Sequence, residues 1–136
     1  MKLDRDRLNN RYRCLDQTAI HIVCEFYAYA LSGSVAYACV VLPLNAYAAL
    51  CLWSGGTNSF GNPVQMRLQP AIQLYLLPIL LRGDYTNYFN GIGYGFLCLA
   101  CFVVSKRIRG WGHVLFHIIA TPYSLVLLEA AKSVKL

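Results

Sequence analysis

Charged residues are scarce in this chain, and two long stretches contain none. Asp, Glu, Lys and Arg together make up 13% of the 136 residues, whereas 57% are hydrophobic. A soluble domain usually carries about 25% charged residues. No charged residue lies between Glu25 and Arg67 or between Asp84 and Lys106, and each gap is long enough for a bilayer-spanning helix of about 20 residues. The deficit argues against an ordinary soluble domain and indicates lipid surroundings.

The chain also lacks several common catalytic motifs. It has no G-x-S-x-G motif, no phosphate-binding glycine loop and no paired carboxylates. Its net charge of +6 is concentrated in clusters that flank apolar segments, whereas nucleic-acid binding needs basic residues along a folded polar face. We therefore expect no nucleic acid among its partners, and anionic phospholipid headgroups instead. The headgroup-binding candidates are Arg5, Arg7, Arg11, Arg13, Lys106, Arg107 and Arg109.

The six cysteines do not indicate a disulfide framework. Five lie inside apolar runs and only Cys14 lies outside, so we expect reduced thiols that pack as small apolar side chains. The pair Cys98 and Cys101 has C-x-x-C spacing but lies in the middle of an apolar segment, where thiols stay protonated. Charges of both signs alternate in residues 1–16, which predicts that no signal peptide is cleaved.

The apolar pattern predicts an all-α, polytopic integral membrane protein with three to five apolar helices. Residues 1–16 are expected to form a polar, basic N-terminal arm, and residues 17–136 a single transmembrane helical domain. Residues 17–53 are apolar apart from Ser32-Gly33-Ser34. They predict either one long tilted helix or two tightly joined helices.

The second half of the chain alternates loops with further apolar segments. Residues 54–67 contain three glycines and a proline and predict a loop. The next run, 68–81, is too short to span a bilayer comfortably, which indicates a re-entrant, interfacial or protein-covered segment. Residues 90–105 and 111–129 predict two further spans. A smooth strip for close helix contact is formed by Gly91, Gly93 and Gly95.

The distribution of lysine and arginine predicts the orientation. It places the N-terminal arm and the 106–109 turn on the same side of the membrane, so an even number of crossings must separate them. Three spans satisfy this condition if 68–81 does not cross, and five satisfy it if 18–31 and 68–81 both cross. Either number puts the two chain termini on opposite sides.

Three histidines and one acid are the candidates for a metal site. His113 and His117 lie four residues apart, as do His21 and Glu25, so each pair shares one helix face and two helices together could offer four ligands to zinc. Alternatively, Glu25 pairs with an arginine of the arm, His21 and His113 lie at the membrane interface, and His117 hydrogen-bonds a backbone carbonyl. A haem held between His117 and either His21 or His113 is a third alternative.

Two stretches resemble the superfamily of hemolysin III, the progestin and adiponectin receptors and the alkaline ceramidases. Residues 13–20, RCLDQTAI, resemble the start of its third helix, and residues 91–107 followed by GHVLFH resemble its sixth helix, basic turn and final H-x-x-x-H helix. The resemblance implies that His113 and His117 bind zinc in a lipid amide hydrolase, with Asp16 as the associated acid. The family's first two helices, which carry the third ligand, have no counterpart here, so His21 would have to substitute.

The sequence thus predicts a small, non-catalytic integral subunit of a larger membrane complex, with a structural, assembly or lipid-binding role. A mitochondrial respiratory-chain or ATP synthase assembly is one example, and the size and basic arm favour the mitochondrial inner membrane. Small residues in the spans favour contact with other membrane subunits, and bound phospholipid is expected. The alternatives are a zinc-dependent lipid amidohydrolase that uses the H-x-x-x-H pair and a haem-bearing electron-transfer subunit.

Overall fold

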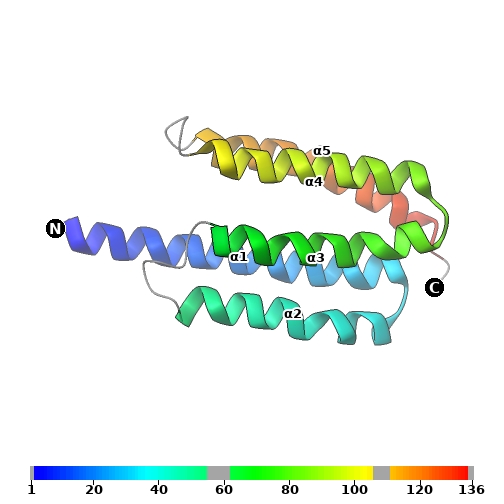
Figure 1. The fold of residues 1–136 in the computed structure, drawn as a ribbon, viewed down its shortest axis with the longest axis horizontal. Helices are drawn as coiled ribbons and strands as arrows, with labels where there is room; N and C mark the ends of the chain where they lie inside the picture. The colour runs from blue at the N-terminus through cyan, green and yellow to red at the C-terminus, as the bar shows by residue number, and fades with distance from the viewer. Residues whose placement is uncertain (1, 55–61, 106–110, 135–136) are drawn as a thin grey trace. The chain divides into compact units, whose positions relative to one another are not determined.

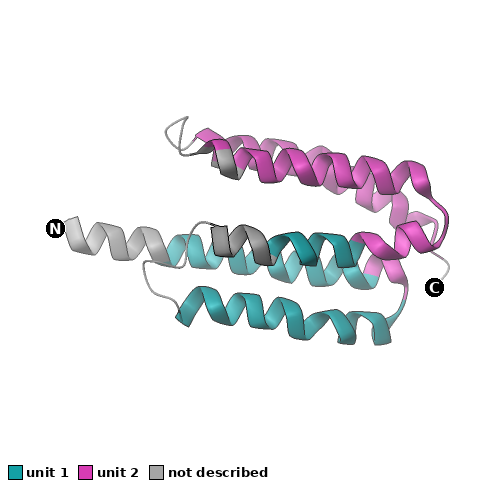
Figure 2. Ribbon diagram, viewed as in Figure 1, with its two compact units in different colours: residues 1–29, 34–75 teal, residues 30–33, 76–136 magenta. Residues whose placement is uncertain are grey.

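The computed structural model describes residues 2–54, 62–105 and 111–134, and these contain helices and no strands (Figure 1). The all-α prediction is therefore confirmed. The chain divides into two compact units, residues 1–29 with 34–75 and residues 30–33 with 76–136 (Figure 2). The helices are α1 (Lys2–Ser32), α2 (Val35–Ser54), α3 (Asn62–Leu81), α4 (Tyr85–Ser105) and α5 (Trp111–Lys132).

Helix α1 continues without a break from the polar arm into the apolar segment. Its buried side chains recur at steps of three and four residues, the spacing of a single stripe along a helix. Two of these side chains, at positions 17 and 21, are polar, so the interior of the first unit is not purely apolar. The buried stripe in this unit consists of Cys14, Gln17, His21, Cys24 and Ala28.

Gly33 and Ser34 join α1 to α2, so residues 17–53 form two tightly joined helices rather than one. Gly33 has a φ of 64°, the left-handed conformation that commonly ends a helix. The hydroxyl of Ser34 accepts a hydrogen bond of 3.2 Å from the Tyr37 N–H, and the Ser34 carbonyl accepts one of 3.1 Å from the Ala38 N–H. Ser34 thereby caps α2, and the short connection makes α1 and α2 antiparallel.

Helix α3 begins earlier than the sequence predicts. Residues 62–67 fall in the expected loop but are helical. Pro63 lies in the first turn, where a helix has no partner for the backbone N–H and where the fixed φ of proline fits. In the first unit, the Tyr37 hydroxyl donates a 2.6 Å hydrogen bond to the Leu74 carbonyl, and the rings of Tyr27 and Tyr75 lie 5.6 Å apart. Helix α3 thus contacts both α1 and α2 there.

In the second unit, a sharp turn separates α3 from α4. Gly83 has a φ of 78°; its N–H donates to the Leu80 carbonyl at 2.9 Å, and the Asp84 N–H donates to the Ile79 carbonyl at 3.2 Å. This pair of bonds is a Schellman motif, which satisfies the last carbonyls of α3. The Asp84 carboxylate then caps α4 by accepting bonds from the backbone and side-chain amides of Asn87, at 3.3 and 2.8 Å.

A glycine allows close contact between the end of α3 and α4. A Cβ atom on Gly91 would lie 2.8 Å from Cδ2 of Leu76, whereas one on Gly93 would have no atom within 4 Å. Further along, the rings of Tyr94 and Tyr123 stack with centroids 6.2 Å apart and join α4 to α5. Within the predicted glycine strip, Gly91 therefore makes a close contact with α3, whereas the space beside Gly93 is open.

Two helices in the described part of the chain are long and apolar enough to cross a membrane, Val35–Ser54 and Val114–Lys132. Only 22% of the most apolar window of each is buried inside the protein, whereas the core helix of a soluble domain is mostly covered. Large apolar side chains instead remain exposed on both helices. They are Val35, Val40, Leu42, Tyr47, Leu50 and Trp53 on α2, and Trp111, Val114, Leu115, Ile118, Leu125 and Leu128 on α5.

Candidate functional site

A cluster of three polar side chains joins α1 to α2 in the first unit. Asn45 lies in the middle of α2 and donates a hydrogen bond of 2.9 Å from Nδ2 to Oε2 of Glu25. Its Oδ1 lies 3.1 Å from Nδ1 of His21. Because an amide oxygen can only accept, Nδ1 of His21 must carry the proton in this bond. The amide therefore links the imidazole, which donates from Nδ1, to the carboxylate.

Because these side chains are buried, the loss of one of their hydrogen bonds would be costly in free energy. His21 and Asn45 are only 2% and 4% exposed, and Glu25 is half-buried. A buried polar group that loses its partner costs about 1 to 3 kcal/mol. The three residues should therefore act as one unit, in which the loss of the central amide affects both of its neighbours.

Further polar contacts continue toward the N-terminal part of α1. The Thr18 hydroxyl donates to the Cys14 carbonyl at 2.7 Å and accepts a 3.0 Å bond from the indole N–H of Trp53. The thiol of Cys14 donates to the Leu52 carbonyl at 3.4 Å, and burial raises the pKa of this thiol above its usual value. Gln17 is buried, and its Oε1 has no hydrogen-bond partner among the described residues.

The polar cluster lies in a groove between α1 and α2, with a volume of about 410 Å³. Most of its lining is apolar or small, and Glu25 is its one acidic residue. Every residue that lines it belongs to the first unit. The lining consists of Thr18, His21, Ile22, Glu25, Phe26 and Tyr29 from α1 and Ala38, Leu42, Asn45, Ala46 and Ala49 from α2.

The predicted metal ligands lie in different units. His21 and Glu25 share one side of α1 in the first unit, where Asn45 bridges them, and His21 is buried there. His113 and His117 belong to α5 in the second unit; the side chain of His117 is exposed, and that of His113 is outside the description. Among the described residues, no group of three or more His, Cys, Asp or Glu side chains could hold a metal ion. The metal site remains a prediction.

The predicted headgroup-binding residues are described only in part. Arg11 and Arg13 lie on α1 with exposed side chains. The side chains of Arg5 and Arg7 and the whole of 106–109 fall outside the described residues. The six cysteines are free thiols, as the sequence predicts.

Two residues important to the structure were not singled out by the sequence analysis. Asn45 is the one amide in the apolar run of α2, which is a signal for a buried polar contact. Arg82 donates to the carbonyl of Leu31, at the end of α1, and at 3.3 Å to that of Ala130 in α5. Nothing in the local sequence of Arg82 indicates these distant carbonyls.

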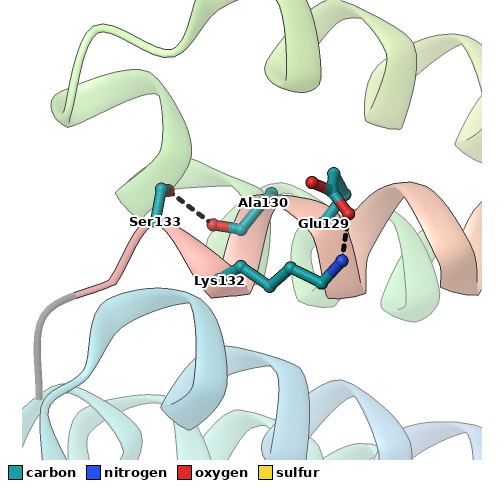
Figure 3. Close-up of polar contacts among 4 residues, drawn as sticks. All are labelled: Glu129, Ala130, Lys132 and Ser133. Carbon is teal, nitrogen blue, oxygen red and sulfur yellow. Dashed lines mark hydrogen bonds and ion pairs between the residues drawn. The ribbon is translucent and has the colours of Figure 1, made fainter.

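The last turn of α5 carries a small group of polar contacts (Figure 3). Lys132 and Glu129 form a 2.6 Å ion pair with both side chains exposed. The Ser133 hydroxyl donates a 2.7 Å bond to the Ala130 carbonyl, which also accepts from Arg82. Exposed ion pairs of this type contribute about 0 to 1 kcal/mol, so the carbonyl contacts are the more important feature of this turn.

No family model, curated protein or solved structure matches the chain. The resemblance to the hemolysin III superfamily, and the roles it implies for His113, His117 and Asp16, therefore remain predictions.

Proposed function

We propose that this chain is an integral membrane protein and serves as a non-catalytic subunit of a larger membrane assembly. The observation that carries the proposal is the distribution of apolar surface on α2 and α5. Both helices expose large apolar side chains, while His21 and Asn45 are buried inside the first unit. Hydrocarbon or apolar protein is the surrounding that suits such an exterior.

The free energy of apolar burial favours lipid or apolar protein over water around these two helices. Full burial of a large apolar side chain is worth about 1.5 to 3 kcal/mol, and the exposed chains on α2 and α5 retain 40% to 76% of their accessible surface. Even half of that gain, taken over both helices, is comparable to the 5 to 15 kcal/mol by which a whole domain is typically stable. A chain with this surface would associate in water, whereas a bilayer or partner helices would cover it.

A subunit role is supported by the small side chains on the same surfaces. Ala36 and Ala46 of α2 are exposed, and small residues let transmembrane helices approach closely. Anionic headgroups are the proposed ligands of the basic residues on α1 and of those at positions 106–109. The mitochondrial inner membrane, and a respiratory-chain or ATP synthase assembly within it, stay predictions that depend on chain size and the basic arm.

Extraction of membranes that contain the full chain tests the first half of the proposal. We expect the protein to remain in the pellet after an alkaline carbonate wash and to be released only by detergent. A native gel in mild detergent, followed by mass spectrometry, then tests the second half. Release by carbonate would contradict membrane integration, and recovery from its native membrane as an isolated 15.3 kDa chain would contradict the subunit role.

A further inference from the structure

We infer that the groove between α1 and α2 receives a transmembrane helix of a partner subunit, and that this helix carries a lysine or arginine near its centre. The inference deepens the proposed function and rests on it. It depends on the shape of the groove, on its apolar walls and on the position of Glu25 within it.

The groove extends along both α1 and α2. Its α1 wall runs from Thr18 to Tyr29 and its α2 wall from Ala38 to Ala49, so each wall covers about three helical turns, or about 16 Å. The two helices are antiparallel, and the walls lie opposite each other along their whole length. Side-chain ridges of one helix pack into the grooves on the surface of another, and a third helix could contact both walls in this way.

The walls are suited to close approach by an apolar helix. Ile22, Phe26 and Leu42 supply apolar contact, and Ala46 supplies a place where a partner backbone can come near. Phe26 and Leu42 are 69% and 50% exposed, so they have apolar surface left to bury.

The carboxylate of Glu25 indicates which type of side chain the partner helix carries. Glu25 accepts its hydrogen bond from Asn45, and no ion pair of Glu25 occurs among the described residues. An ionised carboxylate held inside a membrane costs at least about 2.5 kcal/mol, and Glu25 is bonded to the middle of α2, which is a candidate span. A lysine or arginine from another helix would offset this cost and would also supply hydrogen-bond donors.

The position of the polar cluster favours a helix over a lipid. Glu25, His21 and Asn45 lie near the middle of the groove, not at either end. A phospholipid or single-chain amphiphile places its polar head at the membrane surface, which would leave its acyl chain against the carboxylate. A membrane-crossing helix instead presents the middle of its own length to this point.

Synthetic transmembrane peptides provide a direct test with the full chain in phosphatidylcholine vesicles. One probe is a leucine- and alanine-rich peptide with a single central lysine, and its matched control has leucine at that position. We expect resonance energy transfer between labelled protein and peptide to report at least tenfold tighter association for the lysine peptide. Glu25→Gln, which keeps an acceptor for Asn45, should abolish that preference, whereas Glu129→Gln outside the groove should not.

A second pair of variants tests the groove itself. Ala46→Phe should fill it and weaken binding of the lysine peptide, whereas Ala100→Phe, at an exposed position of α4 in the second unit, should leave binding unchanged. Circular dichroism must show native helix content for each variant. Equal binding of the two peptides, or a bound lipid that Ala46→Phe displaces while neither peptide binds, would overturn the inference. Such a result in a protein that resists carbonate extraction would leave the proposed function intact, whereas failure to insert at all would contradict the proposed function instead.

Discussion

The guanidinium of Arg82 donates a hydrogen bond to the carbonyl oxygen of Leu31, in the last turn of α1. Its second terminal nitrogen donates to the carbonyl of Ala130 near the end of α5. Helix C-termini carry partial negative charge and carbonyls without intrahelical partners. One cation in the second unit therefore satisfies two helix ends that are 99 residues apart in the sequence (130 minus 31).

Replacement of Arg82 should destabilise the second unit. Hydrogen bonds to charged groups are worth about 1.5 to 3 kcal/mol, and the exposure of Arg82 reduces this, so we expect Arg82→Met to lower the free energy of unfolding by about 1 to 2 kcal/mol. Titration with sodium dodecyl sulfate, followed by circular dichroism, measures the change. Lys132→Met, which removes only the exposed ion pair with Glu129, is the control and should cost under about 1 kcal/mol. Equal effects of the two variants would contradict the role of Arg82.

Asn45 should be the most sensitive member of the polar cluster. Asn45→Leu leaves His21 and Glu25 without the amide that joins them, so we expect a loss of about 1 to 3 kcal/mol in unfolding free energy. Asn90→Leu, at an exposed position of α4, makes the same chemical change and should shift stability by less than about 0.5 kcal/mol. The same detergent titration compares them, and a neutral Asn45→Leu would show that the cluster does not hold α1 to α2.

The glycines of α4 offer a matched pair of substitutions. Alanine is about 1 kcal/mol more favourable than glycine in a helix, so Gly93→Ala, with open space around its Cβ, should stabilise the protein. Gly91→Ala gains the same propensity but forces a Cβ to 2.8 Å from the fully buried Leu76, and overpacking typically costs about 1 to 3 kcal/mol. We therefore expect Gly91→Ala to be less stable than Gly93→Ala by at least about 1 kcal/mol. The reverse order would place the close contact elsewhere.

The raised pKa of the Cys14 thiol predicts that this thiol reacts slowly with maleimide and that the stability of the protein depends on pH. The folded state holds this proton more tightly than the unfolded state, for which the ordinary pKa is 9.0. The stabilisation is therefore fully present below pH 9 and is lost as the pH rises through the folded-state pKa. The test uses two chains with one cysteine each: one keeps Cys14 alone, and the other has Leu15→Cys, at an exposed neighbouring position, with every native cysteine replaced. Labelling by maleimide at pH 8 should be several times slower at Cys14. Equal rates would contradict burial of the thiol.

The histidine pair of α5 gives a prediction about zinc. Under the proposed non-catalytic role, we expect the purified chain to bind much less than one zinc ion, because two histidines on one helix do not make a complete zinc site. Elemental analysis after dialysis against zinc measures the ratio. One zinc ion per chain that is lost in His117→Ala would instead favour the lipid amidohydrolase alternative.

Local sequence signals predicted some parts of this structure and not others. The break at Ser32-Gly33-Ser34 was one of the two alternatives that the sequence left open, and it forms because Gly33 is suited to the left-handed φ that ends α1 and Ser34 to the cap of α2. The shared face of His21 and Glu25 followed from helical spacing. The helical start of α3 was not predicted, because asparagine and proline at 62–63 are equally typical of a loop and of a first helical turn.

The contact between Asn45 and α1 was also beyond the sequence analysis. His21 and Asn45 are 24 residues apart, and their meeting depends on the length of the connection between α1 and α2 as well as on the rotation of each helix about its axis. Periodicity fixes which residues share one helix face but not which face a second helix presents. For the same reason, the contact of Gly91 with Leu76 was predicted only as a general tendency of glycine.

The two-residue connection at Gly33 and Ser34 has a consequence for biosynthesis. If the chain is integrated into a membrane as we propose, a connection of two residues would make α1 and α2 enter the bilayer together as a helical hairpin. His21, Glu25 and Asn45 could then form their hydrogen bonds before they leave the aqueous phase. The polar groups would then enter the hydrocarbon already partnered, and a hydrogen-bonded polar group costs less to bury than an unpartnered one.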